Sequence, residues 1–235
     1  MKKLFLSFVF LILFISPVFA KPVGEVYVNK NYNLDSLKTA LVLPVVFQVA
    51  ISEGEAFFTE KVNQKWDDLI FSLSEDLSFL LKKPKDVIER DMLVKGTKPE
   101  ALSPEMMAQK AASLSDQYVN AYIRAVVTKC EYITVRHPEE LEWATTYDYI
   151  SVRENNKWVT KSVPRRYQRV KPAWSENFAV GAVTIEIRDS KTNDLIIGSS
   201  VSATTGDDLF TSAPTLTTHI TNVITNATKR LTKIK

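Results

Sequence analysis

The chain has 235 residues, of which 45% are hydrophobic and 24% are charged. These fractions are ordinary for a globular protein and exclude disordered, collagenous and multi-span membrane chains. The formal net charge is only +3, and it falls further if an N-terminal segment with Lys2 and Lys3 is removed, so charge points to no nucleic-acid partner.

The first twenty residues have the three-part form of a secretory signal peptide. Two lysines precede an apolar stretch, Leu4–Ile15, and Val18-Phe19-Ala20 forms a cleavage site. Such a stretch spans about 18 Å as a helix, well short of the roughly 30 Å hydrocarbon core, which favours a cleaved signal over a permanent anchor. We therefore expect residues 1–20 to be a signal peptide cleaved near Ala20. The remaining chain, 21–235, would be exported to the periplasm or the extracellular space.

The first half of the exported chain predicts one strand and two helices. The nearly unbroken apolar run 39–47 suits a strand buried on both faces, with regular pairing ending near Pro44. A helix over 53–82 follows, with Ser52 and Glu55 as a capping box, an apolar stripe through Trp66, and Pro84 as its stop. Residues 86–89 could form a short strand. Ser103 caps a second helix, which begins with Pro104.

The second half is rich in β-branched and aromatic residues, and it ends in a helix. Asn155-Asn156 and the segment 189–194 predict tight turns, with Asn193 in a left-handed conformation. Gly206-Asp207-Asp208 caps an amphipathic helix over 208–234. The candidate strands are 118–135, 143–153, 157–170, 178–189 and 194–204. These elements predict a single α/β (α+β) domain, with a mixed parallel and antiparallel sheet packed against helices, an inserted β-hairpin and a C-terminal amphipathic helix.

Four pieces of the chain resemble the curli-secretion lipoprotein superfamily (CsgG-like), which shares its fold with the N-terminal domain of TolB. They are KTALVLPV (38–45), DQYVNAYIRAVVTK (116–129), AVTIEIRDSKTNDLIIGSSVSATTGD (182–207) and the closing helix. The chain departs from the family at Asn193, where the family has a turn glycine, and at Gln117, near its usual acidic position. The matching positions are Ala40, Leu43, Pro44, Ile185, Ile187, Asp189, Thr192, Asp194, Ile196 and Ile197.

The resemblance implies one CsgG/TolB-N-like α/β domain over 21–235, in which 130–177 is a β-hairpin insertion. It also implies a mostly non-enzymatic role in envelope assembly or secretion. The residue after the expected cleavage is Lys21 rather than cysteine, so we expect no lipid attachment.

The insertion holds the candidate binding site. Six bases with no acid lie between 157 and 171, and aromatic residues are interleaved with them. Such a hairpin could bind phosphate groups of an anionic surface or headgroup. The alternative is a solvated edge whose charges prevent aggregation, with Glu139, Glu140 and Glu142 partly neutralising it. Both sets of alternate residues along 157–169 include polar or charged groups, so neither face would tolerate hydrocarbon and we expect no membrane pore from this hairpin. The candidate residues are Lys157, Trp158, Lys161, Arg165, Arg166, Arg169 and Lys171.

The residues favour a protein that is not an enzyme, with no cofactor, metal site or small-molecule substrate. No nucleophile-elbow, phosphate-loop or zinc-protease motif occurs in the sequence. Cys130, the only cysteine, is expected to be a buried, inert thiol, and His137 and His219 lack metal-ligand spacing. We therefore expect an exported binding or assembly module at the cell envelope, with a protein partner or self-association. The alternative is a subunit or accessory factor of a secretion channel related to curli export.

Overall fold

The computed structural model describes residues 22–50, 55–98, 101–206 and 212–234. The expected signal peptide, Ser52 of the expected capping box, and Asp207 and Asp208 lie outside these residues. The described chain divides into two compact units. One comprises residues up to 133 and from 178 onward, and we call it the α/β unit; the other is 134–177, the long hairpin.

The α/β unit is built on a mixed seven-stranded sheet with the order β1-β9-β8-β5-β2-β4, to which β3 adds by pairing with β5. Pairs β1/β9 and β8/β9 are antiparallel, whereas β2/β4, β2/β5 and β3/β5 are parallel. The predicted fold class is therefore confirmed. The strands are β1 (Val23–Val28), β2 (Thr39–Val42), β3 (Val46–Phe47), β4 (Leu80–Lys82), β5 (Ala121–His137), β8 (Trp174–Asp189) and β9 (Leu195–Gly206).

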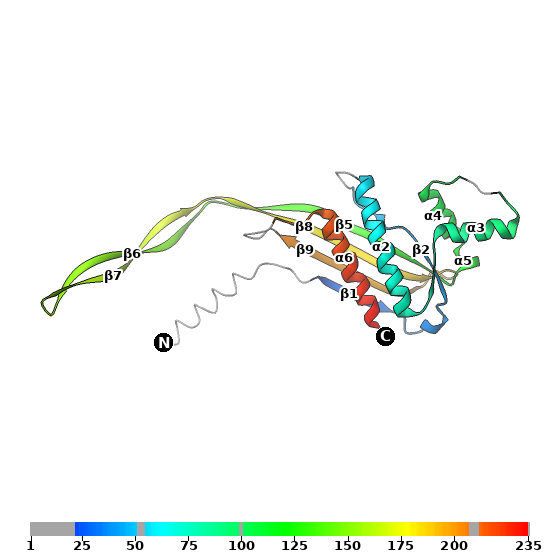
Figure 1. Cartoon of the computed structure of the whole chain (residues 1–235), viewed down its shortest axis with the longest axis horizontal. Coiled ribbons are helices and arrows are strands. Elements are labelled where there is room, and N and C mark those ends of the chain that lie inside the picture. The colour runs from blue at the N-terminus through cyan, green and yellow to red at the C-terminus, as the bar shows by residue number, and fades with distance from the viewer. Residues whose placement is uncertain (1–21, 51–54, 99–100, 207–211, 235) are drawn as a thin grey trace. The chain divides into compact units, whose positions relative to one another are not determined.

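Two long helices, α2 (Glu55–Leu77) and α6 (Leu216–Leu231), cover one face of the sheet (Figure 1). On the apolar stripe of α2, Val62, Trp66, Ile70 and Leu73 are fully buried, as their spacing predicts, and Leu69 and Leu77 are half-buried. Ala40 and Val42 of β2 belong to this core, so the predicted burial of Val42 is confirmed. Leu41 points to the opposite face. There it packs against residues of α3 (Pro84–Lys95) and α4 (Pro104–Ser113). The short helices α5 (Ser115–Tyr118), η1 (Leu34–Ser36) and η2 (Thr232–Ile234) complete the α/β unit.

Three expected elements differ from the structure. Residues 86–89 form no strand, because Pro84 begins α3 and the Asp86 carboxylate accepts a hydrogen bond from the Lys83 N–H at 2.9 Å. Helix α2 ends at Leu77 rather than at 82, because Ser78 has a φ of +61° and the chain then enters edge strand β4. The C-terminal helix begins at Leu216, because the Thr215 hydroxyl caps it and residues 212–215 are not helical.

An irregular segment follows β2, and side chains of α2 form two hydrogen bonds with its backbone. Pro44 has no N–H, and regular pairing of β2 ends at Val42, as expected from the sequence. The Trp66 indole donates a hydrogen bond to the Leu43 carbonyl at 3.0 Å, and the Val45 N–H donates to the Asn63 side chain at 2.8 Å. Helix α2 therefore holds the break between β2 and β3 in place.

Candidate functional site

The long hairpin consists mainly of β6 (Glu140–Glu154) and β7 (Lys157–Lys171), which form an antiparallel two-stranded sheet. Its turn is Asn155-Asn156, with φ values of +49° and +62°. A two-residue turn with positive φ at both positions is type I′, which the pair of asparagines favours. The register runs without a slip from Glu154 opposite Lys157 to Glu140 opposite Lys171.

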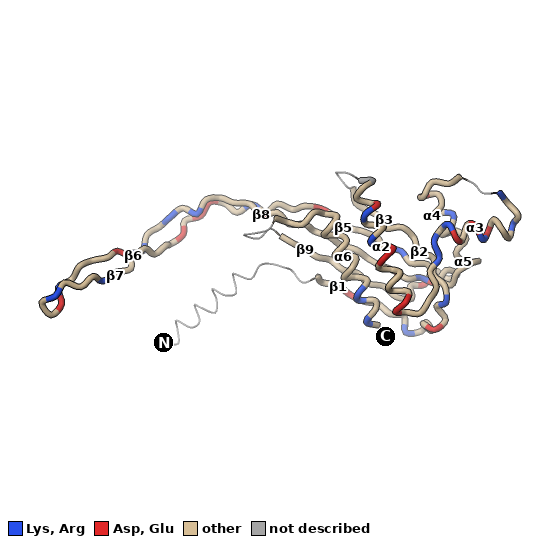
Figure 2. Tube along the Cα trace, in the orientation of Figure 1, with Lys and Arg blue, Asp and Glu red and all other residues tan. Residues whose placement is uncertain are grey.

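The register separates the side chains of the hairpin into two faces, because residues directly opposite each other project to the same side. One face, the charged face, bears every acid of the two strands. Glu142 pairs with Arg169 at 2.5 Å, Asp148 lies 3.9 Å from Arg165, and Glu154 forms an ion pair with Lys161. Figure 2 shows that both acidic and basic residues occur along β6 and β7. The charged residues of this face are Glu140, Glu142, Asp148, Glu154, Lys157, Lys161, Arg165, Arg169 and Lys171.

The other face, the aromatic face, has no acid among its paired residues. Its large side chains are exposed to solvent: Trp158 is 73% exposed and Tyr149 is 76% exposed. Small polar residues, such as Ser151 opposite Thr160, lie between the aromatic ones. The apolar, aromatic and basic residues of this face are Leu141, Trp143, Tyr147, Tyr149, Arg153, Trp158, Pro164, Arg166 and Val170.

The seven candidate residues predicted from the sequence therefore do not form one basic patch. Five of them lie on the charged face, where three form ion pairs with acids of β6. Trp158 and Arg166 lie on the aromatic face. Four further residues of the aromatic face come from β6 and are not among the predicted ones: Trp143, Tyr147, Tyr149 and Arg153. A signal for them was available, because the two-residue turn at Asn155-Asn156 fixes which residues of the two strands lie opposite each other.

The base of the long hairpin is held together by side chains. The rings of His137 and Trp174 stack, with centroids 4.1 Å apart and planes 11° apart. The Lys171 ammonium lies 5.5 Å from the Trp174 centroid, and His137 contacts Glu176 at 3.3 Å. These contacts tie the two ends of the hairpin together and leave the aromatic face of β6 and β7 uncovered within this unit.

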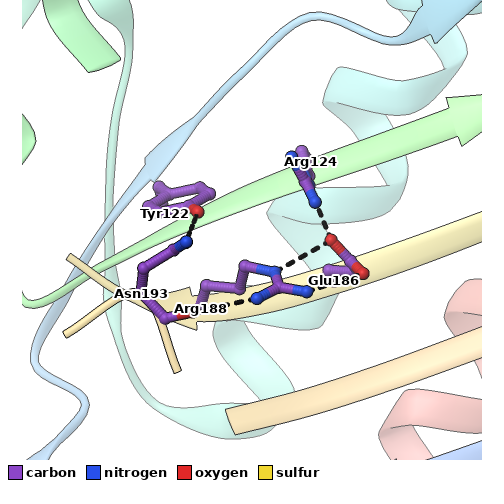
Figure 3. A network of polar contacts seen from close by, with 5 residues as sticks. All are labelled: Tyr122, Arg124, Glu186, Arg188 and Asn193. Carbon is purple, nitrogen blue, oxygen red and sulfur yellow. Dashed lines mark hydrogen bonds and ion pairs between the residues drawn. The ribbon is translucent and has the colours of Figure 1, made fainter. Parts of the chain in front are cut away.

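The α/β unit carries a second polar cluster, on the face of the sheet opposite α2 and α6 (Figure 3). Glu186 of β8 accepts hydrogen bonds from Arg124 of β5 at 2.6 Å and from Arg188 at 3.0 Å. The hydrogen bond from Arg188, followed by that from Arg124, lowers the pKa of Glu186, and Glu186 in turn raises the pKa of Arg188. Arg188 also donates to the Asn193 carbonyl, and the Tyr122 hydroxyl bonds the Asn193 side chain.

This cluster joins β5, β8 and the turn after β8. Asn193 has a φ of +63°, which confirms the predicted left-handed conformation. The Asp189 carboxylate accepts hydrogen bonds from the N–H groups of Lys191 and Thr192. The charges of Glu186 and Arg188 satisfy each other, so the geometry is that of a structural brace between neighbouring strands.

Two further titratable groups of the α/β unit, Cys130 and His219, are buried. Cys130 is 6% exposed, and its burial raises the pKa of the thiol to about 11. His219 is buried at the start of α6 with Nε2 3.1 Å from the Ala203 carbonyl, and burial lowers its pKa. Across the described ranges, no group of three or more His, Cys, Asp or Glu residues is arranged to hold a metal ion. Within the same ranges, no helix has the length and apolar character needed to cross a membrane.

Comparison with known proteins gives a weak likeness in structure alone. No family model and no curated protein sequence matches the chain. The PelC dodecamer of Paraburkholderia phytofirmans aligns with a TM-score of 0.40 and 9% identity, covering 90% of this chain and 97% of that one. Lipoprotein GNA1162 of Neisseria meningitidis aligns with a TM-score of 0.36 and 11% identity, covering 82% and 99%. Likenesses at this level assign neither a family nor an activity, and the resemblance to the curli-secretion superfamily stays a prediction.

Proposed function

We propose that this chain is a non-enzymatic, exported cell-envelope protein that acts as a binding or assembly module through protein contacts. The signal-peptide pattern of residues 1–20 supports export. The inert setting of Cys130 and the structural partners of His219 and Glu186 support a role other than catalysis. The observation that carries the proposal is the long hairpin, whose sheet has only two strands and therefore two outer edges among the described residues.

The turn determines which backbone groups of the hairpin are free. In a two-residue hairpin, the pair next to the turn exchanges both backbone hydrogen bonds, so Glu154 and Lys157 form such a pair. Hydrogen-bonded and non-hydrogen-bonded pairs then alternate along the register. The residues of the aromatic face, including Ser151 and its opposite residue Thr160, are the non-hydrogen-bonded ones. Their N–H and C=O groups point outward along the two edges.

The two edges differ in their capacity to accept another strand. Pro164 lies in the middle of β7, at one of the outward-pointing positions, and it supplies no N–H. Strand β6 has no proline over its 15 residues, so its outer edge keeps every donor. An isolated two-stranded sheet is at best marginally stable in water, and a third strand stabilises it. A partner protein would therefore bind by adding an extended segment to the β6 edge.

Proline substitution tests this proposal with a matched control. Ser151→Pro removes an outward N–H from the β6 edge, and Thr160→Pro removes one from the β7 edge at the same cross-strand pair. Neither change removes a hydrogen bond between β6 and β7, so the hairpin should tolerate both. A photo-crosslinking amino acid placed at Thr145 reports on the β6 edge in the native envelope, and one placed at Ser162 reports on the β7 edge.

We expect strong protein adducts from position 145 and weak ones from position 162. Ser151→Pro should abolish the adduct at 145, whereas Thr160→Pro should leave it unchanged. An adduct of twice the mass of the chain would identify the partner as a second copy. Equal adducts from both edges, or an adduct that survives Ser151→Pro, would contradict binding at β6. A protein that stays in the membrane after carbonate washing and needs detergent for extraction would favour the alternative, a secretion-channel subunit.

A further inference from the structure

The aromatic residues of the long hairpin are of a particular kind. The whole chain has 12 phenylalanines, 8 tyrosines and 4 tryptophans, yet residues 134–177 contain three tryptophans, three tyrosines and no phenylalanine. Tryptophan and tyrosine combine a large apolar ring with a polar group, and they concentrate where an apolar phase meets water. Among the described residues, nothing hydrogen-bonds the hydroxyls of Tyr147 and Tyr149 or the indole N–H groups of Trp143 and Trp158. Their polar groups are therefore available to an external surface.

The two faces of the hairpin also differ in charge. All acids of β6 lie on the charged face, opposite or diagonal to bases of β7. The aromatic face carries two arginines and no acid: Arg153 lies opposite Trp158, and Arg166 lies opposite Thr145. Arginine binds phosphate oxygens through two parallel hydrogen bonds, and its apolar stem can lie along an apolar surface. The aromatic face therefore carries two cations beside Trp and Tyr residues and no acid, whereas four acids offset most of the positive charge of the charged face. Unpaired cations beside amphipathic rings suit a surface with phosphate groups above an apolar layer.

We propose that the aromatic face of the long hairpin lies flat in the headgroup region of an anionic lipid bilayer. The aromatic rings would enter the boundary between headgroups and acyl chains, Arg153 and Arg166 would bind lipid phosphates, and the charged face would remain in water. The long hairpin would not enter the hydrocarbon. The hydroxyls of Ser151 and Thr160 and the free backbone groups of both edges need water or headgroups as hydrogen-bond partners. The lipid surface would contact the aromatic face of the long hairpin, whereas a protein partner would bind the outer edge of β6, so the two proposals are independent.

The distribution of the aromatic residues favours a lipid surface over a protein hot spot. Trp, Tyr and Arg are also the residues that dominate protein interfaces, but there they cluster near the centre of a patch. Here the aromatic residues extend along the long hairpin from Trp143 to Trp158, which lies next to the turn. Arg166 lies between them, and Arg153 lies opposite Trp158. A flat bilayer can contact such a row along its whole length.

Flotation of the full mature chain with purified vesicles tests the proposal without any protein partner. We expect the protein to float with vesicles of phosphatidylcholine and phosphatidylglycerol at low salt, and much less with phosphatidylcholine alone. Arg153→Gln with Arg166→Gln should weaken binding about thirtyfold, since each cation near an anionic surface contributes about fivefold. Trp143→Ser with Trp158→Ser should lower the affinity by about tenfold or more. The matched control, Lys161→Gln with Arg165→Gln on the charged face, should change it by less than about twofold.

Tryptophan fluorescence gives a second readout: the wild type should shift to shorter wavelength with anionic vesicles, and the Trp143→Ser, Trp158→Ser variant should lose most of this shift. A wild type that floats with neither vesicle would overturn the proposal. Equal losses of vesicle binding in the charged-face and aromatic-face variants would also overturn it, because bases on both faces would then contribute equally. Aromatic-face variants that bind vesicles normally but lose the envelope crosslink at position 145 would assign this face to a protein. If Ser151→Pro loses the position-145 crosslink but still binds vesicles, the β6 edge binds the protein partner and the aromatic face binds lipid independently of it.

Discussion

The indole of Trp66 both fills the core and hydrogen-bonds the backbone, and Trp66→Phe tests how much these two roles stabilise the fold. The ring is fully buried in the core between α2 and the sheet, and its N–H bonds the Leu43 carbonyl at 3.0 Å in the irregular segment before Pro44. Phenylalanine fits the same site but has no donor. The substitution therefore leaves the Leu43 carbonyl without its partner, and it removes part of the buried ring.

The expected loss can be worked from these two effects. A half-buried carbonyl left without a hydrogen bond costs about 1–3 kcal/mol. The smaller ring buries about 40 Å² less surface, which costs about 1 kcal/mol at 25 cal/mol per Å². The free energy of unfolding should therefore fall by about 2–4 kcal/mol. Asn63→Ala, which frees the Val45 N–H on the same segment, should cost about 1–2 kcal/mol through hydrogen bonding alone.

Urea unfolding followed by far-UV circular dichroism measures these changes without relying on the altered tryptophan. The midpoint should shift and the slope should stay constant, because the surface exposed on unfolding barely changes. Phe71→Leu is the control, since Phe71 lies on the same helix and is 59% exposed, so it should change the stability by less than about 0.5 kcal/mol. A Trp66→Phe protein within about 0.5 kcal/mol of wild type would refute the view that α2 holds the break between β2 and β3.

Three further predictions concern buried residues of the α/β unit. Val42→Asp places an unpaired charge in the core and should destabilise by several kcal/mol in urea unfolding; a loss within about 0.5 kcal/mol would place Val42 at the surface. Burial lowers the pKa of His219, so the unfolded chain binds the extra proton first; stability should fall as pH drops below about 6.5, and His219→Gln should flatten this dependence in melts from pH 5 to 7. With a pKa of about 11, Cys130 should react slowly with iodoacetamide in the native protein and rapidly in urea, as followed by mass spectrometry, and fast native labelling would contradict its burial.

Local chemistry explains why several features could be predicted from the sequence. The asparagines at 155, 156 and 193 adopt positive φ, because their side chains tolerate this conformation and the flanking strands demand tight turns. The α2 stripe through Trp66 is buried because its spacing leaves one continuous apolar face. Each of these features depends on residues that are close together in the chain.

Errors arose where tertiary contacts decide between local alternatives. Leu80 and Leu81 continue the helical spacing of α2, but Ser78 turns the chain and β4 gains hydrogen bonds by pairing with β2. Val87 and Ile88 suit a strand as well as a helix, and packing against Leu41 from α3 decides between them. Strand β1 is not among the predicted strands, because its strand character depends on its pairing with β9, far away in the sequence.

The arrangement of side chains on the hairpin could not be predicted from β7 alone. The excess of bases in 157–171 makes the hairpin a candidate, whereas the ion pairs with Glu142, Asp148 and Glu154 depend on the opposite strand. When the strands are paired outward from the Asn155-Asn156 turn, the charged face, with bases and acids together, is distinguished from the aromatic face, which has no acid. Composition along a single strand cannot show this separation.

Excision of the long hairpin tests the central claim most directly, namely that contacts at the envelope are made by this unit while the α/β unit folds without it. Thr134 and Asn177 are joined by a side-chain hydrogen bond of 2.8 Å, so an Asn-Gly turn can connect them in place of 135–176. Sedimentation of the native envelope, with urea unfolding of the purified protein, gives both readouts. We predict one cooperative unfolding transition and loss of envelope association. A folded, excised protein that still co-sediments with the envelope like the full chain would contradict the account.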